Sequence, residues 1–167
     1  MIVYQTEDKH FQIRQTTKND IDLIYSFIYK LAVYEKLEHI MTATKVSLEH
    51  SLFDLKQAEV VIAEVDQKPI GFALFFHNYS TFLGKANLYL EDLFIDNEYR
   101  HQGYGKLMFK YLAKLAVERS CERFDWMCLN WNEPSIKFYQ SLGAKPMSDW
   151  ITFRLEGEAL KSLSVIK

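Results

Sequence analysis

The stretch "YRHQGYGK", residues 99–106, decides how this chain of 167 residues is interpreted. It holds two glycines one residue apart, between a β-rich run ending at Ile95 and a long amphipathic stretch. Apolar residues recur at helical spacing in that second stretch: Tyr104, Met108, Tyr111, Leu112 and Leu115. A strand, a glycine turn and a helix bring backbone N–H groups and the positive end of a helix dipole to one place. The stretch therefore predicts a site for phosphate.

Two other phosphate-binding patterns do not fit the same residues. The Walker pattern needs Ser or Thr after Gly-Lys, but Leu107 follows Lys106, and Arg100 stands at the first glycine position. The dinucleotide fingerprint needs a third glycine where Met108 stands. What remains is an anion-binding turn of another kind, or a turn that uses glycine only for its backbone freedom.

The composition favours one domain without a nucleic-acid partner. Hydrophobic residues make up 49% of the chain and aromatic residues 15%, enough for one well-packed core. We therefore expect a single domain over residues 1–167. The chain has 20 Lys and Arg against 22 Asp and Glu, a formal charge of −2, whereas a nucleic-acid binder would need a basic surface. Small cationic or neutral partners fit better.

Targeting and metal signals are absent from the sequence. Cys121 and Cys128 are the only cysteines and form no CxxC, which favours a reduced intracellular setting. The N-terminus carries charges throughout and lacks the apolar segment of a signal peptide or a membrane span. We therefore expect a cytoplasmic protein. The histidines have no HExxH spacing and there is no GxSxG, so we expect neither a metal site nor a hydrolase nucleophile.

Hydrophobic periodicity predicts strands mixed with helices. Strands are expected at 11–15, 58–65, 69–78, 87–95, 123–129 and 149–155. Helices are expected at 21–34, at 42–55, from 104 onward and at 132–142, with one or two further helical turns after 156. A short polar connection joins the second and third strands and favours an antiparallel hairpin. This order predicts an α/β or α+β layered domain.

Two carboxylates interrupt the otherwise apolar run at 87–95. Strict alternation puts Glu91 and Asp92 on opposite faces, with Leu88, Leu90 and Phe94 sharing one face. A buried carboxylate without a partner is costly, so each needs a counter-ion, a raised pKa or a ligand. Pairing with a neighbouring Arg or Lys is the structural alternative to a functional role.

The glycine turn and its surroundings resemble a known family. "RHQGYG", residues 100–105, matches R/Q-x-x-G-x-G/A, the pyrophosphate-binding motif of the GNAT acetyltransferases. The segments "LAVYEKLE" (31–38), "YLEDLFI" (89–95) and "WNEPSIKFYQSLGA" (131–144) are similar to those of the spermidine/spermine (diamine) and thialysine acetyltransferases. The resemblance implies a GNAT fold, which is a mixed central sheet flanked by helices and splayed between its fourth and fifth strands. It also implies acetyl-CoA as acetyl donor and a homodimer.

By this resemblance, coenzyme A is held by three parts of the chain. The backbone of the central strand would pair with the pantetheine arm, the amides of the turn would bind the pyrophosphate, and the start of a later helix would add two contacts. These residues are Leu93, Phe94, Ile95, Arg100, His101, Gln102, Gly103, Tyr104, Gly105, Lys106, Asn132 and Ser135. Asn132 and Ser135 are equally good helix-start residues, and the two roles are compatible.

The resemblance also implies how an amine would be acetylated. An alkyl amine, with a pKa of about 10.4, must lose a proton, and Glu91 matches the residue that contacts the amine and accepts this proton through water. Asp92 would make the site acidic, while Tyr34 and Glu35 match a contact pair for the acceptor. Tyr139 matches the acid that protonates the leaving thiolate, although its helical spacing also fits an ordinary core tyrosine.

These residues predict direct acetyl transfer to a primary amine of a small cationic substrate, which is a polyamine, a diamine, thialysine or a lysine-like molecule. Two alternatives stay open, namely a non-catalytic sensor of acyl-CoA and an enzyme that acetylates proteins. A sensor would keep the glycine turn but lose Tyr139 or Glu91, and this chain keeps both. The mammalian-type polyamine enzymes have a longer loop where this chain has "VDQKPIG" (65–71), so the exact acceptor stays open.

Overall fold

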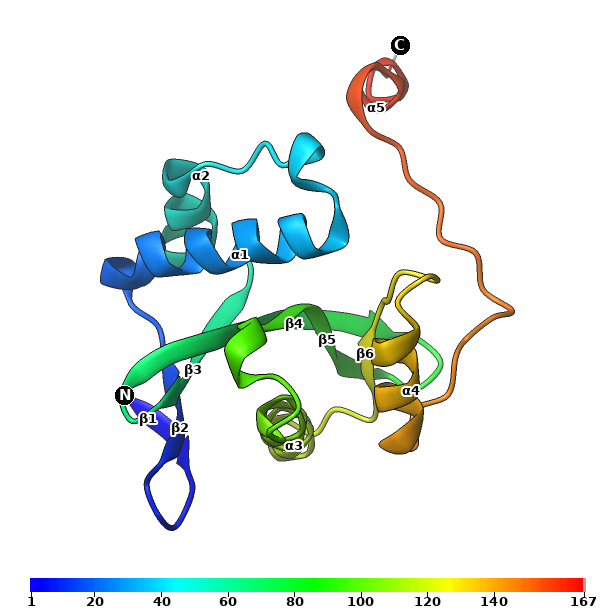
Figure 1. Ribbon diagram of the computed structural model, residues 1–167. Coiled ribbons are helices and arrows are strands. Elements are labelled where there is room, and N and C mark those ends of the chain that lie inside the picture. The colour runs from blue at the N-terminus through cyan, green and yellow to red at the C-terminus, as the bar shows by residue number, and fades with distance from the viewer. Residues whose placement is uncertain (167) are drawn as a thin grey trace. The chain divides into compact units, whose positions relative to one another are not determined.

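The computed structural model describes residues 1–166, and the chain divides into two compact units, Met1–Met127 and Cys128–Lys167. In the first unit the described residues form one sheet with the strand order β1-β2-β3-β4-β5-β6 (Figure 1). The strands are β1 (Ile2–Gln5), β2 (Phe11–Gln15), β3 (Glu59–Val65), β4 (Lys68–Ser80), β5 (Lys85–Ile95) and β6 (Phe124–Trp126). Neighbouring strands are antiparallel except β6, which is parallel to β5. The sequence did not predict β1, because four residues carry too short a pattern.

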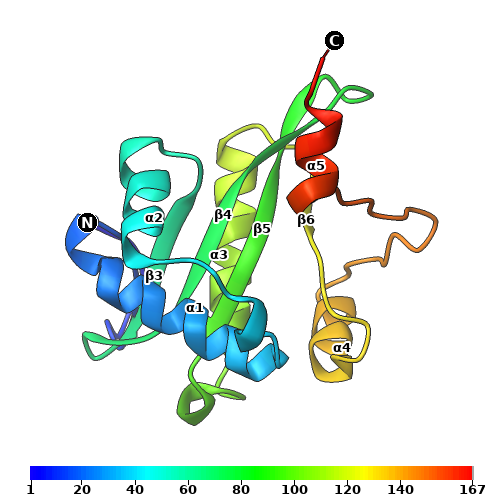
Figure 2. The ribbon, with the colours of Figure 1, turned by 90° about the horizontal axis from the view of Figure 1, so that it is seen from above.

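Helices cover both faces of this sheet. α1 (Ile21–Glu35) and α2 (Lys45–Glu49) lie on one face and α3 (Tyr104–Glu118) on the other (Figures 1 and 2). The predicted helix at 42–55 begins as expected, since the Thr44 side chain accepts a hydrogen bond from the N–H of Ser47 at 3.1 Å, but it continues from His50 to Asp54 as a π-helix. The layered class of fold predicted from the sequence is confirmed.

Aromatic packing fixes α1 on the sheet. Phe27 of α1 stacks on Phe72 of β4, with ring centroids 5.8 Å apart, and its ring lies 6.2 Å from that of Phe94 on β5. All three side chains are buried in one apolar cluster. Burying a side chain of this size contributes about 1.5–3 kcal/mol. The cluster therefore holds the second half of α1 against the end of β5.

A bulge interrupts β5 at the two carboxylates. Leu74 of β4 pairs with Asp92, but the next residue, Phe75, pairs with Leu90. Glu91 is therefore an extra residue without a partner on β4. Such a bulge disturbs the alternation of side chains that a regular strand would have.

The bulge corrects the predicted faces of β5. The partners of Leu90 and Phe94 on β4 are three residues apart, so these two side chains lie on opposite faces of the sheet and not on the same one. Asp92 lies two residues before Phe94 and shares the α1 face with it. Alternation no longer fixes the direction of Glu91, which is exposed. A hydrophobic pattern could not reveal this, because a bulge depends on the partner strand.

The second unit contains α4 (Glu133–Ser141) and α5 (Gly157–Leu163). Both helices were predicted, but the strand expected at 149–155 is wrong, because these residues form no regular structure. Trp150, Ile151 and Phe153 of this segment are exposed. Alternating apolar residues give a segment two faces, but a strand also needs a neighbouring strand, and no strand of the described residues pairs with this segment.

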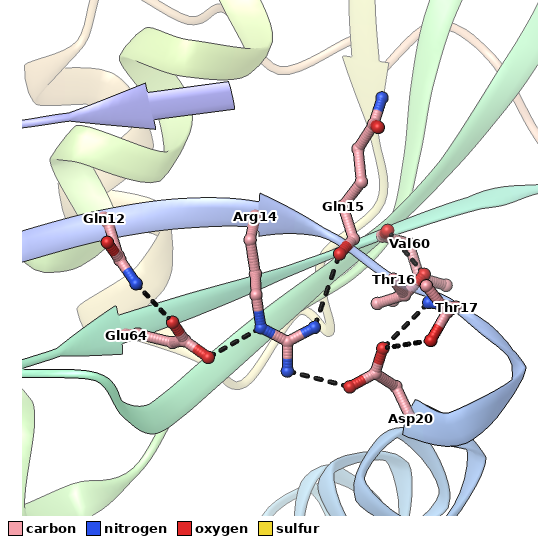
Figure 3. A network of polar contacts seen from close by, with 8 residues as sticks. All are labelled: Gln12, Arg14, Gln15, Thr16, Thr17, Asp20, Val60 and Glu64. Atoms are coloured by element: carbon pink, nitrogen blue, oxygen red, sulfur yellow. Dashed lines mark hydrogen bonds and ion pairs between the residues drawn. The ribbon is translucent and has the colours of Figure 1, made fainter. Parts of the chain in front are cut away.

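A polar network ties the start of α1 to the sheet (Figure 3). The Glu64 carboxylate accepts hydrogen bonds from Gln12 Nε2 at 2.6 Å and from Arg14 Nε at 2.7 Å, and Arg14 Nη2 donates to Asp20 at 2.8 Å. Burial opposes ionisation of Asp20, but Arg14 and the N–H of Thr17 outweigh it and hold the pKa of Asp20 below its ordinary value. The guanidinium thus joins a buried carboxylate on β3 to the entrance of α1.

We expect Arg14→Met to lower the free energy of unfolding by about 2 kcal/mol, because Glu64 would keep a buried charge without its cation. Urea unfolding at pH 7 measures this loss. The control is Lys18→Met, which removes an exposed ion pair with Asp54 and should cost clearly less. Equal losses for the two variants would contradict the structural role of the network.

Candidate functional site

The first turn of α3 is open. Gly103 precedes the helix with φ of +89°, a left-handed conformation that favours glycine, and no side chain caps the helix there. A Cβ placed on Gly105 would meet no atom within 4 Å, and its φ lies outside the left-handed region, so neither the turn nor the packing requires glycine at that position. The N–H groups of residues 104–106 lie in the first turn, where a helix offers them no acceptor of its own. The alternative that glycine serves only backbone freedom therefore fits Gly103 but not Gly105.

Arg100 braces the turn before α3. Its Nε donates a hydrogen bond to the carbonyl oxygen of Ile95 at 2.9 Å. Its guanidinium lies 4.4 Å from the ring centroid of Tyr34 on α1 and 5.2 Å from that of Phe94. Gln102 adds a hydrogen bond from Nε2 to the carbonyl oxygen of Glu98 at 3.0 Å. These contacts connect the turn to both β5 and the end of α1.

One side of the second half of β5 has no strand beside it. Pairing with β6 covers only Leu88–Leu90 against Phe124–Trp126, whereas pairing with β4 continues to Ile95. Among residues 1–166, no strand pairs with Glu91–Ile95 on the β6 side. These two strands are the fourth and fifth that the sequence predicted. The backbone of Leu93, Phe94 and Ile95 thus has an edge open to an added strand, and the predicted splay itself stays a prediction.

Carboxylates gather where α1 ends beside the bulge. Burial raises the pKa of Asp92 to about 7, and the charges of Glu91 and Glu35 add to this effect. Burial also raises the pKa of Glu35, the last residue of α1. Within residues 1–166 no Lys or Arg forms an ion pair with any of the three. The structural alternative of simple pairing is therefore not what the structure shows for Glu91 and Asp92.

A fourth carboxylate extends this cluster and was missed in the sequence. Asp125 on β6 pairs in register with Tyr89, and burial together with the charges of Glu91 and Asp125 raises the pKa of Tyr89. The alternation of "RFDWMCL" could have indicated the face of Asp125, but only the register of β6 on β5 brings it near Glu91. We call Glu35, Glu91, Asp92 and Asp125 the acidic cluster.

A cavity of about 660 Å³ opens in the first unit next to Tyr34. The second half of α1, the start of β4 and residues 94–99 line it, and they carry charges of both signs. Lys30 Nζ and the Asp96 carboxylate form an ion pair at 2.8 Å in its wall. Its volume lies in the range of small-molecule sites.

The remaining predicted residues lie on α4 in the second unit. The Asn132 side chain is buried and accepts a hydrogen bond from the N–H of Ser135 at 3.4 Å, so the predicted helix-start role of both residues is present. Tyr139 is half-buried on the same helix, with its ring 5.6 Å from that of Phe138. These three residues are placed within their own unit, whereas the turn, the open edge and the acidic cluster all belong to the first unit.

Comparison with known proteins decides the family. Residues 25–144, more than half of the chain, match the model of the acetyltransferase (GNAT) family. The chain belongs to the GNAT acetyltransferase family. Its members use acetyl-CoA, and the open amides with the space above Gly105 fit the diphosphate of that donor. This GNAT acetyltransferase is therefore an enzyme of the class that the sequence predicted.

Relatives of this GNAT acetyltransferase cover most of its length. It is 32% identical over 165 residues to the thialysine N-epsilon-acetyltransferase of Mus musculus, covering 92% of this chain and 96% of the relative. It is 29% identical over 198 residues to the L-ornithine N5-acetyltransferase NATA1 of Arabidopsis thaliana, covering 91% and 87%. The solved integron cassette protein VCH_CASS6 from V. cholerae superposes with a TM-score of 0.77 at 27% identity, covering 93% of this chain and 98% of that one. The predicted GNAT fold is confirmed.

Two features are absent among residues 1–166. No three His, Cys, Asp or Glu side chains come together in a group that could hold a metal ion. No helix in this part of the chain has both the length and the apolar character that crossing a membrane requires.

Proposed function

We propose that this acetyltransferase transfers the acetyl group of acetyl-CoA to a primary amine of a small cationic acceptor, which is a polyamine, a diamine, thialysine or a lysine-like molecule. The observation that carries the proposal is the acidic cluster, in which Asp92 is largely buried without an ion pair and has a pKa of about 7. Such a cluster attracts cations, and a bound cation offsets the repulsion between its carboxylates. The relatives named for thialysine and L-ornithine act on basic amino acids, which supports the same class.

We further propose that residues 1–167 work as one domain, with the family model, which spans both units, as support. Acetyl-CoA supplies the activated acetyl group when it is bound. The N–H groups of residues 101–106 donate to its diphosphate, with Arg100 bracing the turn, and Asn132 and Ser135 add contacts. The backbone of Leu93–Ile95 pairs with the pantetheine arm along the open edge of β5.

Proton transfer is assigned to two side chains. Glu91 accepts the proton of the ammonium group through water, so that a neutral nitrogen can attack, and Asp92 keeps the surroundings anionic. Tyr34 and Glu35 contact the acceptor at the end of α1. Tyr139 donates a proton to the leaving sulfur. A phenol has a pKa of about 10 and a thiol a pKa of about 8.5, so this transfer needs direct contact between the two groups. Protonation of the thiolate then prevents the reverse reaction.

A homodimer in the cytoplasm completes the proposal. Trp150, Ile151 and Phe153 expose large apolar side chains within residues 149–155, and a second copy of the chain would cover them. Light scattering during gel filtration measures the mass directly. A monomer at micromolar concentration would contradict this part of the proposal.

Gly105→Asp tests the diphosphate site, and Gly105→Ala is its matched control because the motif accepts either glycine or alanine at this position. A Cβ at position 105 meets open space in the protein, and an acidic side chain near the start of a helix is favourable, so both variants should fold. The added carboxylate would repel the diphosphate at the amides, so we expect Gly105→Asp to raise the Kd of coenzyme A by about 10-fold or more, whereas Gly105→Ala should bind it nearly as the wild type does. Calorimetry measures the affinity, with Lys110→Ala on the same helix as a second control. An unchanged Kd in Gly105→Asp would place the diphosphate elsewhere.

The proposed activity is tested by release of free thiol. Purified protein receives acetyl-CoA with spermidine, putrescine, thialysine, L-ornithine, L-lysine or peptides with free amino termini. Thiol release with the small amines and not with the peptides supports the proposal. Release only with peptides would make the protein a protein acetyltransferase, and binding of coenzyme A without release from any acceptor would make it a sensor.

A further inference from the structure

The first turn of α3 is anchored to the sheet through one side chain. Tyr104 lies between Gly103 and Gly105, so it is the only residue of this triplet with a side chain. Its ring is 8% exposed and stacks on Phe11 of β2, with centroids 5.2 Å apart and an angle of 10° between the planes. Whatever fixes Tyr104 therefore fixes the amides on either side of it.

A chain of hydrogen bonds holds the hydroxyl group of Tyr104. His10 Nε2 lies 3.2 Å from Tyr104 Oη, and His10 Nδ1 lies 2.9 Å from Asp66 Oδ1. Asp66 belongs to the turn between β3 and β4, and His10 immediately precedes β2. A neutral His10 can donate to Asp66 and accept from the tyrosine hydroxyl, and a protonated one can donate to both. The connection thus survives in either charge state.

The rest of α3 does not need this connection in order to fold. Met108 and Leu112 are fully buried and secure the helix further along. The hydrogen bond at Tyr104 instead acts on the first turn, where Gly103 gives the backbone additional freedom. Binding of a diphosphate by several amides requires that these donors are already aligned, because ordering them during binding weakens the affinity.

We infer that His10 and Asp66 are positioning residues for coenzyme A, which act through Tyr104 by aligning the amides of residues 103–106 with the diphosphate. The inference rests on the proposed function, because it assigns residues to the same donor site. It differs from a general role in stability, since its effect should appear only with ligands that carry the diphosphate.

The first test compares affinities for coenzyme A. His10→Ala should raise the Kd by about 3- to 10-fold, the range expected for one hydrogen bond, and leave kcat unchanged. Tyr104→Phe removes the same bond from its other end, so it should have a similar effect, and the double variant should be no weaker than either single one. His50→Ala is the matched control, because His50 Nδ1 also pairs with an aspartate, Asp54, at 3.2 Å on an exposed surface.

The second test uses a shorter donor. S-acetylpantetheine carries the same thioester and arm but no diphosphate, so His10→Ala and the wild type should use it with equal kcat/KM. Equal losses with both donors would overturn the inference, because they would indicate a structural defect. An unchanged Kd of coenzyme A in His10→Ala would also overturn the inference. Absence of binding by the wild type would instead overturn the proposed function itself.

Discussion

Tyr139→Phe is expected to lower the turnover of acetyl transfer by roughly 10²-fold or more, within the range of a lost general acid. The substitution removes only the phenolic hydroxyl and keeps the ring that packs beside Phe138 on α4. The thiolate would then leave without its proton donor. Because Tyr139 is not assigned to the diphosphate or the pantetheine arm, the affinity for coenzyme A should stay nearly intact.

Steady-state rates with saturating acceptor, together with calorimetry of coenzyme A, measure the two effects separately. Tyr111→Phe is the control, since it removes the hydroxyl of another half-buried tyrosine, on α3. Similar melting temperatures would show that both variants are folded. An unchanged rate would remove Tyr139 from the mechanism and return it to the role of a core tyrosine.

Asp92→Asn is expected to stabilise the free protein at pH 8 and to weaken acceptor binding. The pKa of Asp92 is about 7 in the folded protein, against an ordinary value of 3.8. Below about pH 4 the group is protonated in both the folded and the unfolded state and has no effect. Between pH 4 and 7 it ionises only when unfolded, so stability falls as the pH rises. Above pH 7 the cost reaches its full size, on the order of 4 kcal/mol.

Thermal and urea unfolding between pH 4.5 and 8.5 measures this dependence. The stabilisation by Asp92→Asn should grow across this range and level off above pH 7, whereas Asp149→Asn, at an exposed position, should show no such trend. Asp92→Asn should also raise the KM of a cationic acceptor by about 10-fold, because the variant lacks a carboxylate that attracts the cation. A stabilisation independent of pH would show that Asp92 is not titrating in the folded protein.

Local patterns predicted most of the helices and strands and, within the candidate site, the glycine turn. The apolar spacing from Ile21 and the cap at Thr44 predicted where helices begin, because these signals act between residues a few positions apart. The glycine turn predicted an anion site for the same reason, since a strand, a turn and a helix are contiguous in the chain. Gly105 adds a feature that sequence could only suggest, namely open space where its side chain would be.

Patterns failed where a distant partner decides the outcome. The bulge at Glu91 depends on how β4 pairs with β5, and it put Leu90 and Phe94 on opposite faces, with Asp92 on the side of Phe94. Residues 149–155 alternate like a strand but form none, because alternation does not provide a neighbouring strand.

By itself, the sequence determined the class of fold and, through the segments that resemble the GNAT acetyltransferases, the family, since these signals lie in short contiguous stretches of the chain. Only the tertiary structure added Asp125 to the carboxylates that the resemblance had grouped, and only it decided how they are buried. Glu35 comes from a helix, Glu91 and Asp92 from a bulged strand and Asp125 from the strand beside it. The raised pKa of Asp92 arises from burial and from charges that folding brings together, and no local sequence pattern encodes either.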